Sequence, residues 1–83
     1  MSVLVLAHTS DRAIQIAEAR GFEVMGVQWR FANTVRPLYG MGPGFVFMCP
    51  SARKLQQWDQ IHLQLKIAKR KHGESLRFVT VNG

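Results

Sequence analysis

The stretch VLVLAHTSDR at residues 3–12 decides the fold of this chain. It begins with an uninterrupted apolar run and ends in side chains that cap helices. This is the pattern of a buried strand that leads through a turn into a helix. The same pattern recurs in FVFMCPSA at residues 45–52. Because strands of parallel sheets are covered on both faces, their sequences are apolar throughout. Both stretches therefore predict central strands of an α/β domain.

The remaining periodicities predict two more strands, two main helices and a short one. The first main helix is expected to begin at Ser10 or Asp11, with Thr9 or Ser10 as its N-cap, and to end before Gly21. Strands are expected at residues 3–7, 23–29, 45–49 and 76–81, the second main helix from the residue after Ser51 to His72, and the short helix, capped by Asn33, at residues 34–39.

This order of elements predicts one domain. Right-handed crossovers and two central apolar strands favour a mainly parallel sheet with the strand order 2-1-3-4. The expected fold is therefore a single small α/β domain over residues 1–83, with a four-stranded sheet, two main helices, one short helix and an irregular connection at about residues 30–44.

The composition is that of a basic globular protein. Eleven Lys and Arg residues face five Asp and Glu residues among 83, so the formal net charge is +6. This charge favours acidic partners: nucleic acid, an acidic protein or a phosphorylated ligand. One cysteine excludes an internal disulfide. No apolar stretch reaches the length of a membrane span or of a signal sequence, so a cytoplasmic protein that does not enter membranes is expected.

The predicted strand order places the carboxyl ends of the two central strands side by side, where ligands of such sheets bind. Two helix N-termini would meet there, which favours an anion. Arg53 and Lys54 would lie in the first turn of the second helix, where their charge opposes the helix dipole. A solvated, capped turn is the alternative to a ligand. The expected anion-binding residues are His8, Thr9, Ser10, Arg12, Ser51, Arg53 and Lys54.

No catalytic, cofactor or metal motif is recognisable. The glycines at residues 40, 42 and 44 precede a strand instead of opening a helix, so they do not form a phosphate-binding loop. The three histidines are too scattered to share a metal ion. His8 and Cys49 end adjacent predicted strands, which allows a thiolate–imidazole pair oriented by Asp11. The alternative is a buried cysteine beside a turn histidine. We therefore expect no cofactor and no metal.

Two further groups are candidates for contact with a partner. The basic end of the second helix holds more cations than its dipole requires, although nucleic-acid sites usually add aromatic residues, which this stretch lacks. Trp58 is assigned to the core. The irregular connection holds aromatic and apolar side chains that either form an interface or pack against the sheet. The expected partner-binding residues are Arg30, Arg36, Tyr39, Lys66, Lys69, Arg70 and Lys71.

The run over residues 3–21, Trp29 and Arg30, the segment at 33–40 and the apolar strand at 45–49 together resemble short Rossmann-like proteins encoded by bacteriophages. The resemblance implies a viral origin and an NTPase-like core without its phosphate-binding motif. It transfers no catalytic residue.

The leading hypothesis is a small, non-enzymatic, phage-encoded binding protein in the host cytoplasm, whose basic surface engages an acidic host protein or nucleic acid. The alternative is a binder of a nucleotide or another phosphorylated ligand at the carboxyl ends of the central strands. A Cys49-dependent enzyme is a third hypothesis. Either edge strand could also support a homodimer.

Overall fold

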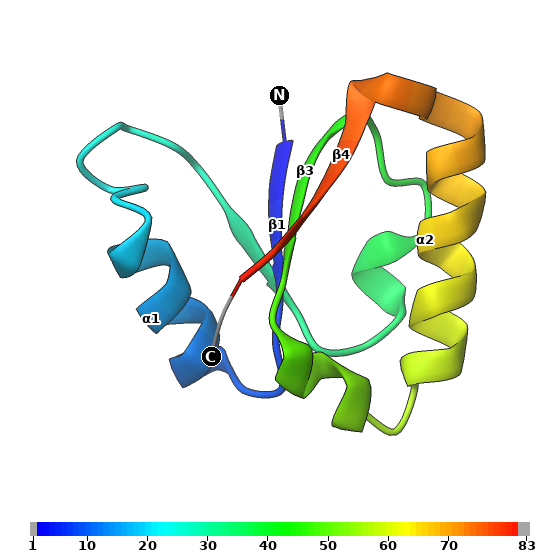
Figure 1. Ribbon diagram of the computed structural model, residues 1–83, viewed down its shortest axis with the longest axis horizontal. Helices are drawn as coiled ribbons and strands as arrows, with labels where there is room; N and C mark the ends of the chain where they lie inside the picture. The colour runs from blue at the N-terminus through cyan, green and yellow to red at the C-terminus, as the bar shows by residue number, and fades with distance from the viewer. Residues whose placement is uncertain (1, 82–83) are drawn as a thin grey trace.

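The computed structural model describes residues 2–81 and contains four strands, two α-helices and three short 3-10 helices (Figure 1). The strands are β1 (Ser2–Leu6), β2 (Arg30–Ala32), β3 (Gly44–Met48) and β4 (Leu76–Thr80). The α-helices are α1 (Ser10–Ala19) and α2 (Trp58–His72), and the 3-10 helices are η1 (Arg36–Leu38), η2 (Pro50–Lys54) and η3 (Gly73–Ser75).

The four strands form one parallel sheet in the order β2-β1-β3-β4. The predicted order is confirmed. In the centre of the sheet Val5 pairs with Phe47, and Phe47 pairs in turn with Val79. Val5 and Leu6 of β1 are fully buried, as the apolar run at residues 3–7 predicts. The carboxyl ends of β1 and β3 therefore lie side by side, and the chain winds away from them in opposite directions.

The sheet separates two hydrophobic cores because successive side chains of a strand point to opposite faces. In Figure 1, α1 lies on one side of the sheet, and α2 and η1 lie on the other. The core on the α2 side consists of Leu4, Leu6, Ala32, Val35, Leu38, Met41, Val46, Ala52, Ile61, Leu65, Ala68 and Leu76. The core on the α1 side consists of Val3, Val5, Ala7, Ala13, Ile16, Ala17, Phe22, Cys49 and Val81.

Helix α1 begins and ends as its sequence predicts. The Thr9 hydroxyl oxygen accepts a hydrogen bond from the backbone N–H of Arg12 at 3.2 Å, which makes Thr9 the N-cap. Gly21 follows the C-cap residue with a φ of 69°, a left-handed conformation that glycine adopts without steric cost. These two signals therefore fix both ends of the helix.

The predicted strand at residues 23–29 is wrong. Residues 21–26 form turns, and the second strand of the chain is β2, further along, which pairs with the outer side of β1. Phe22 is buried in the core on the α1 side, and the backbone N–H of Val27 donates to its carbonyl oxygen at 2.8 Å. Val24 lies in this turn and is 92% exposed, so its apolar side chain is not part of the core.

The second helix begins later than predicted. The chain after β3 forms η2, then Leu55 is extended with ψ near 142°, and α2 begins only at Trp58. Leu55 packs against the core on the α2 side, and this packing accounts for the interruption. Arg53 and Lys54 therefore lie outside α2, and the expected clash between their charges and its dipole does not arise. The short helix is also smaller than predicted, and Val35, not Asn33, occupies its N-cap position, without a side-chain cap.

Candidate functional site

The carboxyl ends of β1 and β3 bring together part of the predicted anion site. The backbone N–H of Cys49 donates to the carbonyl oxygen of Leu6 at 2.9 Å, which joins the two strand ends. His8, Thr9 and Ser10 lie exposed after β1. Ser51, which is half-buried, and the exposed Arg53 and Lys54 follow β3 within η2.

The electrostatics of this crevice differ from the prediction of two α-helix N-termini. Only α1 starts there, and the Thr9 side chain already caps it. The other element, η2, is a 3-10 helix of five residues with no side-chain cap. A helix macrodipole requires several aligned turns, so η2 adds little to anion binding. The crevice therefore lacks the second helix N-terminus on which the predicted anion site depended.

Cys49 directly follows β3 and is only 2% exposed. Burial raises the pKa of its thiol, but hydrogen bonds from Ser51 and from the Arg12 guanidinium outweigh that effect, so the pKa lies below its ordinary value. The Ser51 hydroxyl donates to Cys49 Sγ at 3.1 Å. These hydrogen bonds come from Ser51 and Arg12 and not from His8. The thiol is therefore polarised, and Cys49 belongs to the core on the α1 side.

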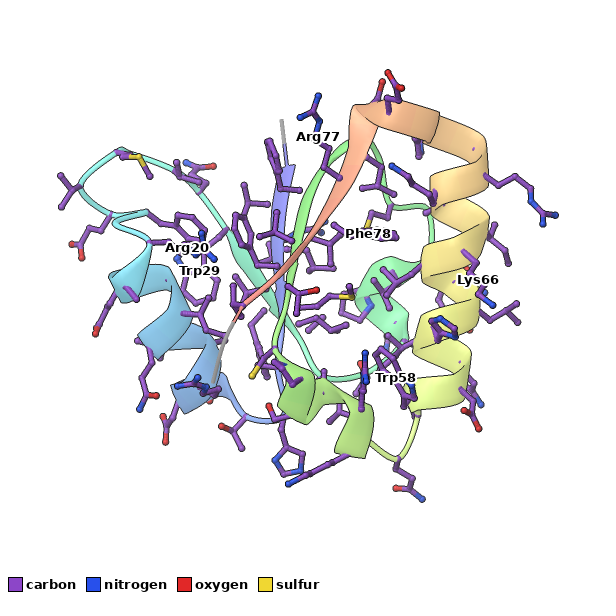
Figure 2. All side chains as sticks on the ribbon, in the orientation of Figure 1. Arg20, Trp29, Trp58, Lys66, Arg77 and Phe78 are labelled. Carbon is purple, nitrogen blue, oxygen red and sulfur yellow. The ribbon has the colours of Figure 1, made fainter. Side chains whose placement is uncertain are left out.

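A second site lies on the α2 side of the sheet, between α2, η2 and the carboxyl ends of β3 and β4. It is a pocket of about 180 Å³. Trp58 and Lys66 of α2 and Phe78 of β4, all labelled in Figure 2, are among the residues that line it. The lining residues are Met48, Cys49, Pro50, Arg53, Trp58, His62, Leu65, Lys66, Phe78 and Thr80.

Aromatic rings and cations both border this pocket. The rings of Trp58 and His62 stack at a centroid distance of 5.5 Å and an interplanar angle of 18°. Phe78 is 37% exposed on β4, and Lys69 Nζ lies 5.8 Å from the centroid of its ring. Lys66 lines the same pocket and is exposed. Such a site can bind a ligand that has both a planar group and a negative charge: the planar group stacks on a ring, and the cations neutralise the charge.

The sequence did not predict that aromatic residues line this pocket. Trp58 packs against the core on the α2 side, as predicted, but it is half-buried and also lines the pocket. The pair of Trp58 and His62, four residues apart on a helix, was the available signal, because such residues share one helix face. Phe78 carried no signal of its own, since only the pairing of β4 with β3 brings it to α2.

The other predicted partner residues are dispersed over the surface. Lys66, Arg70 and Lys71 are exposed on α2, whereas Lys69 is half-buried and donates a hydrogen bond to the carbonyl oxygen of Leu76. Arg30 is exposed on the opposite edge strand β2, and Arg36 is exposed in η1.

The interface expected in the irregular connection is mostly packed away. Val35, Leu38 and Met41 are buried in the core on the α2 side, and only Tyr39 remains well exposed, at 59%. His72 Nε2 lies 2.9 Å from the carbonyl oxygen of Met41, a contact that ties this connection to the end of α2. The packing alternative therefore accounts for these apolar side chains.

Comparison with protein-family models, curated proteins and solved structures gave no significant match. The resemblance to short phage proteins therefore stays a prediction, while the fold itself is Rossmann-like α/β. Among residues 2–81, no group of three or more His, Cys, Asp or Glu residues is placed to hold a metal ion. Within the same residues, neither α1 nor α2 combines the length and the hydropathy of a transmembrane helix.

Proposed function

We propose that this protein binds single-stranded nucleic acid through its α2–β4 face, which we define as Arg53, Trp58, His62, Lys66, Lys69 and Phe78. The observation that carries the proposal is the stacked pair of Trp58 and His62 in one pocket with Lys66 and Phe78. Proteins that bind single strands combine cations that follow the backbone with aromatic rings on which bases stack. The net charge of +6 supports the same class of ligand.

The spacing along α2 fits an extended strand. Trp58, His62, Lys66 and Lys69 recur every three or four residues, so they follow one another along one side of the helix. From the first to the last of them the helix rises about 17 Å. Bases would stack at the Trp58 end, and phosphates would contact the cations further along. Phe78 of β4 forms the opposite wall.

Single strands fit this face better than duplexes. In a duplex the bases are already stacked on one another, so none of them is free to stack on Trp58 or Phe78. A phosphorylated small ligand at the carboxyl ends of β1 and β3 is less favoured, because the short η2 adds little helix dipole there.

The test is fluorescence anisotropy with labelled 12-nucleotide oligonucleotides of DNA and RNA, and with a 12-base-pair duplex, over a range of salt concentrations. The proposal predicts tighter binding of the single strands than of the duplex, and affinity that falls as salt rises. Equal affinity for both forms would indicate a purely electrostatic surface and would contradict the role of the aromatic residues. Absence of binding at low salt would overturn the proposal.

A further inference from the structure

The sheet has an uncovered region on its α1 side. Phe45 and Phe47 of β3 are half-buried there, Arg77 of β4 is exposed and Val79 is half-buried. The other side of these two strands carries α2. Parallel sheets occur almost only with both faces covered, whereas residues 2–81 leave these side chains of β3 and β4 partly exposed on the α1 side.

The uncovered region is apolar at its centre. Phe47 contacts Phe22 edge to face at a centroid distance of 5.1 Å and lies 6.3 Å from the ring of Phe45. A hollow of about 450 Å³ opens beside these rings. Its lining residues are Val3, Phe22, Gly26, Val27, Gln28, Phe45 and Phe47. We call Arg20, Phe22, Phe45, Phe47, Arg77 and Val79 the open sheet face.

Cations flank this apolar centre. The guanidinium carbon of Arg20 lies 5.4 Å from the centroid of the Phe47 ring. Arg77 pairs in register with Phe45, so the two side chains stand next to each other on the same side of the sheet. Figure 2 shows Arg20 and Arg77 on the side of the sheet away from Trp58 and Lys66. Glu74 is the one carboxylate among the residues that line the hollows at Phe45 and Phe47.

We infer that the open sheet face is a docking surface for an amphipathic helix of a partner protein, with apolar side chains toward Phe45 and Phe47 and carboxylates toward Arg20 and Arg77. A helix is the element that covers parallel sheets in α/β folds. The arginines select its charge, because carboxylates form bidentate hydrogen bonds with guanidinium groups. A second copy of this chain is a less favourable occupant. The arginines of the two copies would face each other, and each copy carries a net charge of +6, so the two surfaces would repel.

This surface is independent of the α2–β4 face, from which the sheet separates it. The protein would therefore join a nucleic acid on one side to an acidic helix on the other. Neither ligand would displace the other, because no residue belongs to both surfaces.

The probe is a displayed library of 20-residue helices with apolar residues along one face and an equal mixture of Glu and Lys beside that face. Selection on the protein is expected to enrich Glu over Lys. Arg77→Glu should weaken the selected helices about tenfold, which corresponds to about 1.4 kcal/mol. Lys71→Glu on α2 changes the net charge by the same amount and should leave their affinity unchanged.

Val79→Asp gives a second variant that removes apolar contact instead of charge, and circular dichroism of both variants checks the fold. No enrichment, enrichment of Lys, or equal loss in Lys71→Glu would overturn the inference. A dimer in sedimentation that Val79→Asp dissociates would also overturn it, because a second copy would then cover the face. The inference stands or falls separately from nucleic-acid binding, which Arg77→Glu and Val79→Asp should leave within about twofold.

Discussion

The indole ring of Trp58 lies nearly parallel to the imidazole ring of His62, with ring centroids 5.5 Å apart and an angle of 18° between the planes. The pair stands at the start of α2 and faces the pocket that Phe78 closes from β4. A planar group that enters this pocket meets one stacked pair and one further ring. The stacked pair is therefore the element of the pocket on which base binding should depend.

Removal of the indole should weaken binding of single strands. Stacking of a base on an aromatic side chain contributes about 1–3 kcal/mol, so Trp58→Ala should raise the dissociation constant by about 5- to 150-fold. Tyr39→Ala removes an exposed ring that lies outside the pocket and is the matched control. Anisotropy measures both constants. If the two variants bind equally well, the aromatic residues of the pocket take no part.

Removal of a cation should change the salt dependence. Each phosphate contact to a single strand contributes about 0.7 to the slope of log affinity against log salt concentration. Lys66→Ala should therefore lower that slope by about 0.7. Arg30→Ala removes an exposed cation from the opposite edge strand β2 and should leave the slope unchanged. Equal slopes in all three proteins would place the phosphates elsewhere on the surface.

The Cys49 thiol should make stability depend on pH. Its pKa in the folded protein lies below 9.0, because hydrogen bonds from Ser51 and Arg12 outweigh the effect of burial. Between the folded and unfolded pKa values the unfolded chain holds more protons, so the free energy of unfolding rises with pH there and the gain is lost as pH falls through the folded pKa.

Ser51→Ala should raise the folded pKa and flatten this rise relative to the unsubstituted protein, while Cys49→Ala, which has no thiol, should show no rise from this position. Urea unfolding at several pH values measures the effect, and thiolate absorbance in the ultraviolet gives the pKa directly. A thiol pKa that stays the same in Ser51→Ala would show that the hydroxyl does not stabilise the thiolate.

Two leucines on α2 should respond differently to truncation. Leu65 is 2% exposed within the core on the α2 side, whereas Leu63 is 56% exposed. Leu65→Ala removes buried methyl groups and leaves a cavity, so it should cost about 2–5 kcal/mol of unfolding free energy. Leu63→Ala should change stability by less than about 0.5 kcal/mol. Denaturant unfolding compares the two, and similar losses would mean that α2 packs on the sheet through another face.

The central strands and their order are predictable from sequence because two signals agree. The apolar run before His8 and its repeat before Pro50 each specify a strand covered on both faces, and parallel pairing follows from the helices between strands. Capping residues set the ends of α1. The strands and the ends of α1 depend on local sequence, and the strand order follows from general rules of chain connection, which explains why they are confirmed.

The features that sequence did not predict depend on contacts between distant residues. The burial of Phe22 closes a turn where the alternation of side chains indicated a strand, and Leu55 interrupts the expected second helix by packing into the core. The α2–β4 face has the same origin. Trp58 and Phe78 are 20 positions apart in the sequence and meet only because β4 pairs with β3.

The most direct measurement of the central claim is quenching of tryptophan fluorescence by an unlabelled single-stranded oligonucleotide. The chain has two tryptophans, and Trp29 packs against the core on the opposite side of the sheet. Binding at the α2–β4 face predicts strong quenching in the protein and in Trp29→Phe, and its loss in Trp58→Phe. Quenching that persists in Trp58→Phe and disappears in Trp29→Phe would contradict binding at this face and place the nucleic acid on the α1 side.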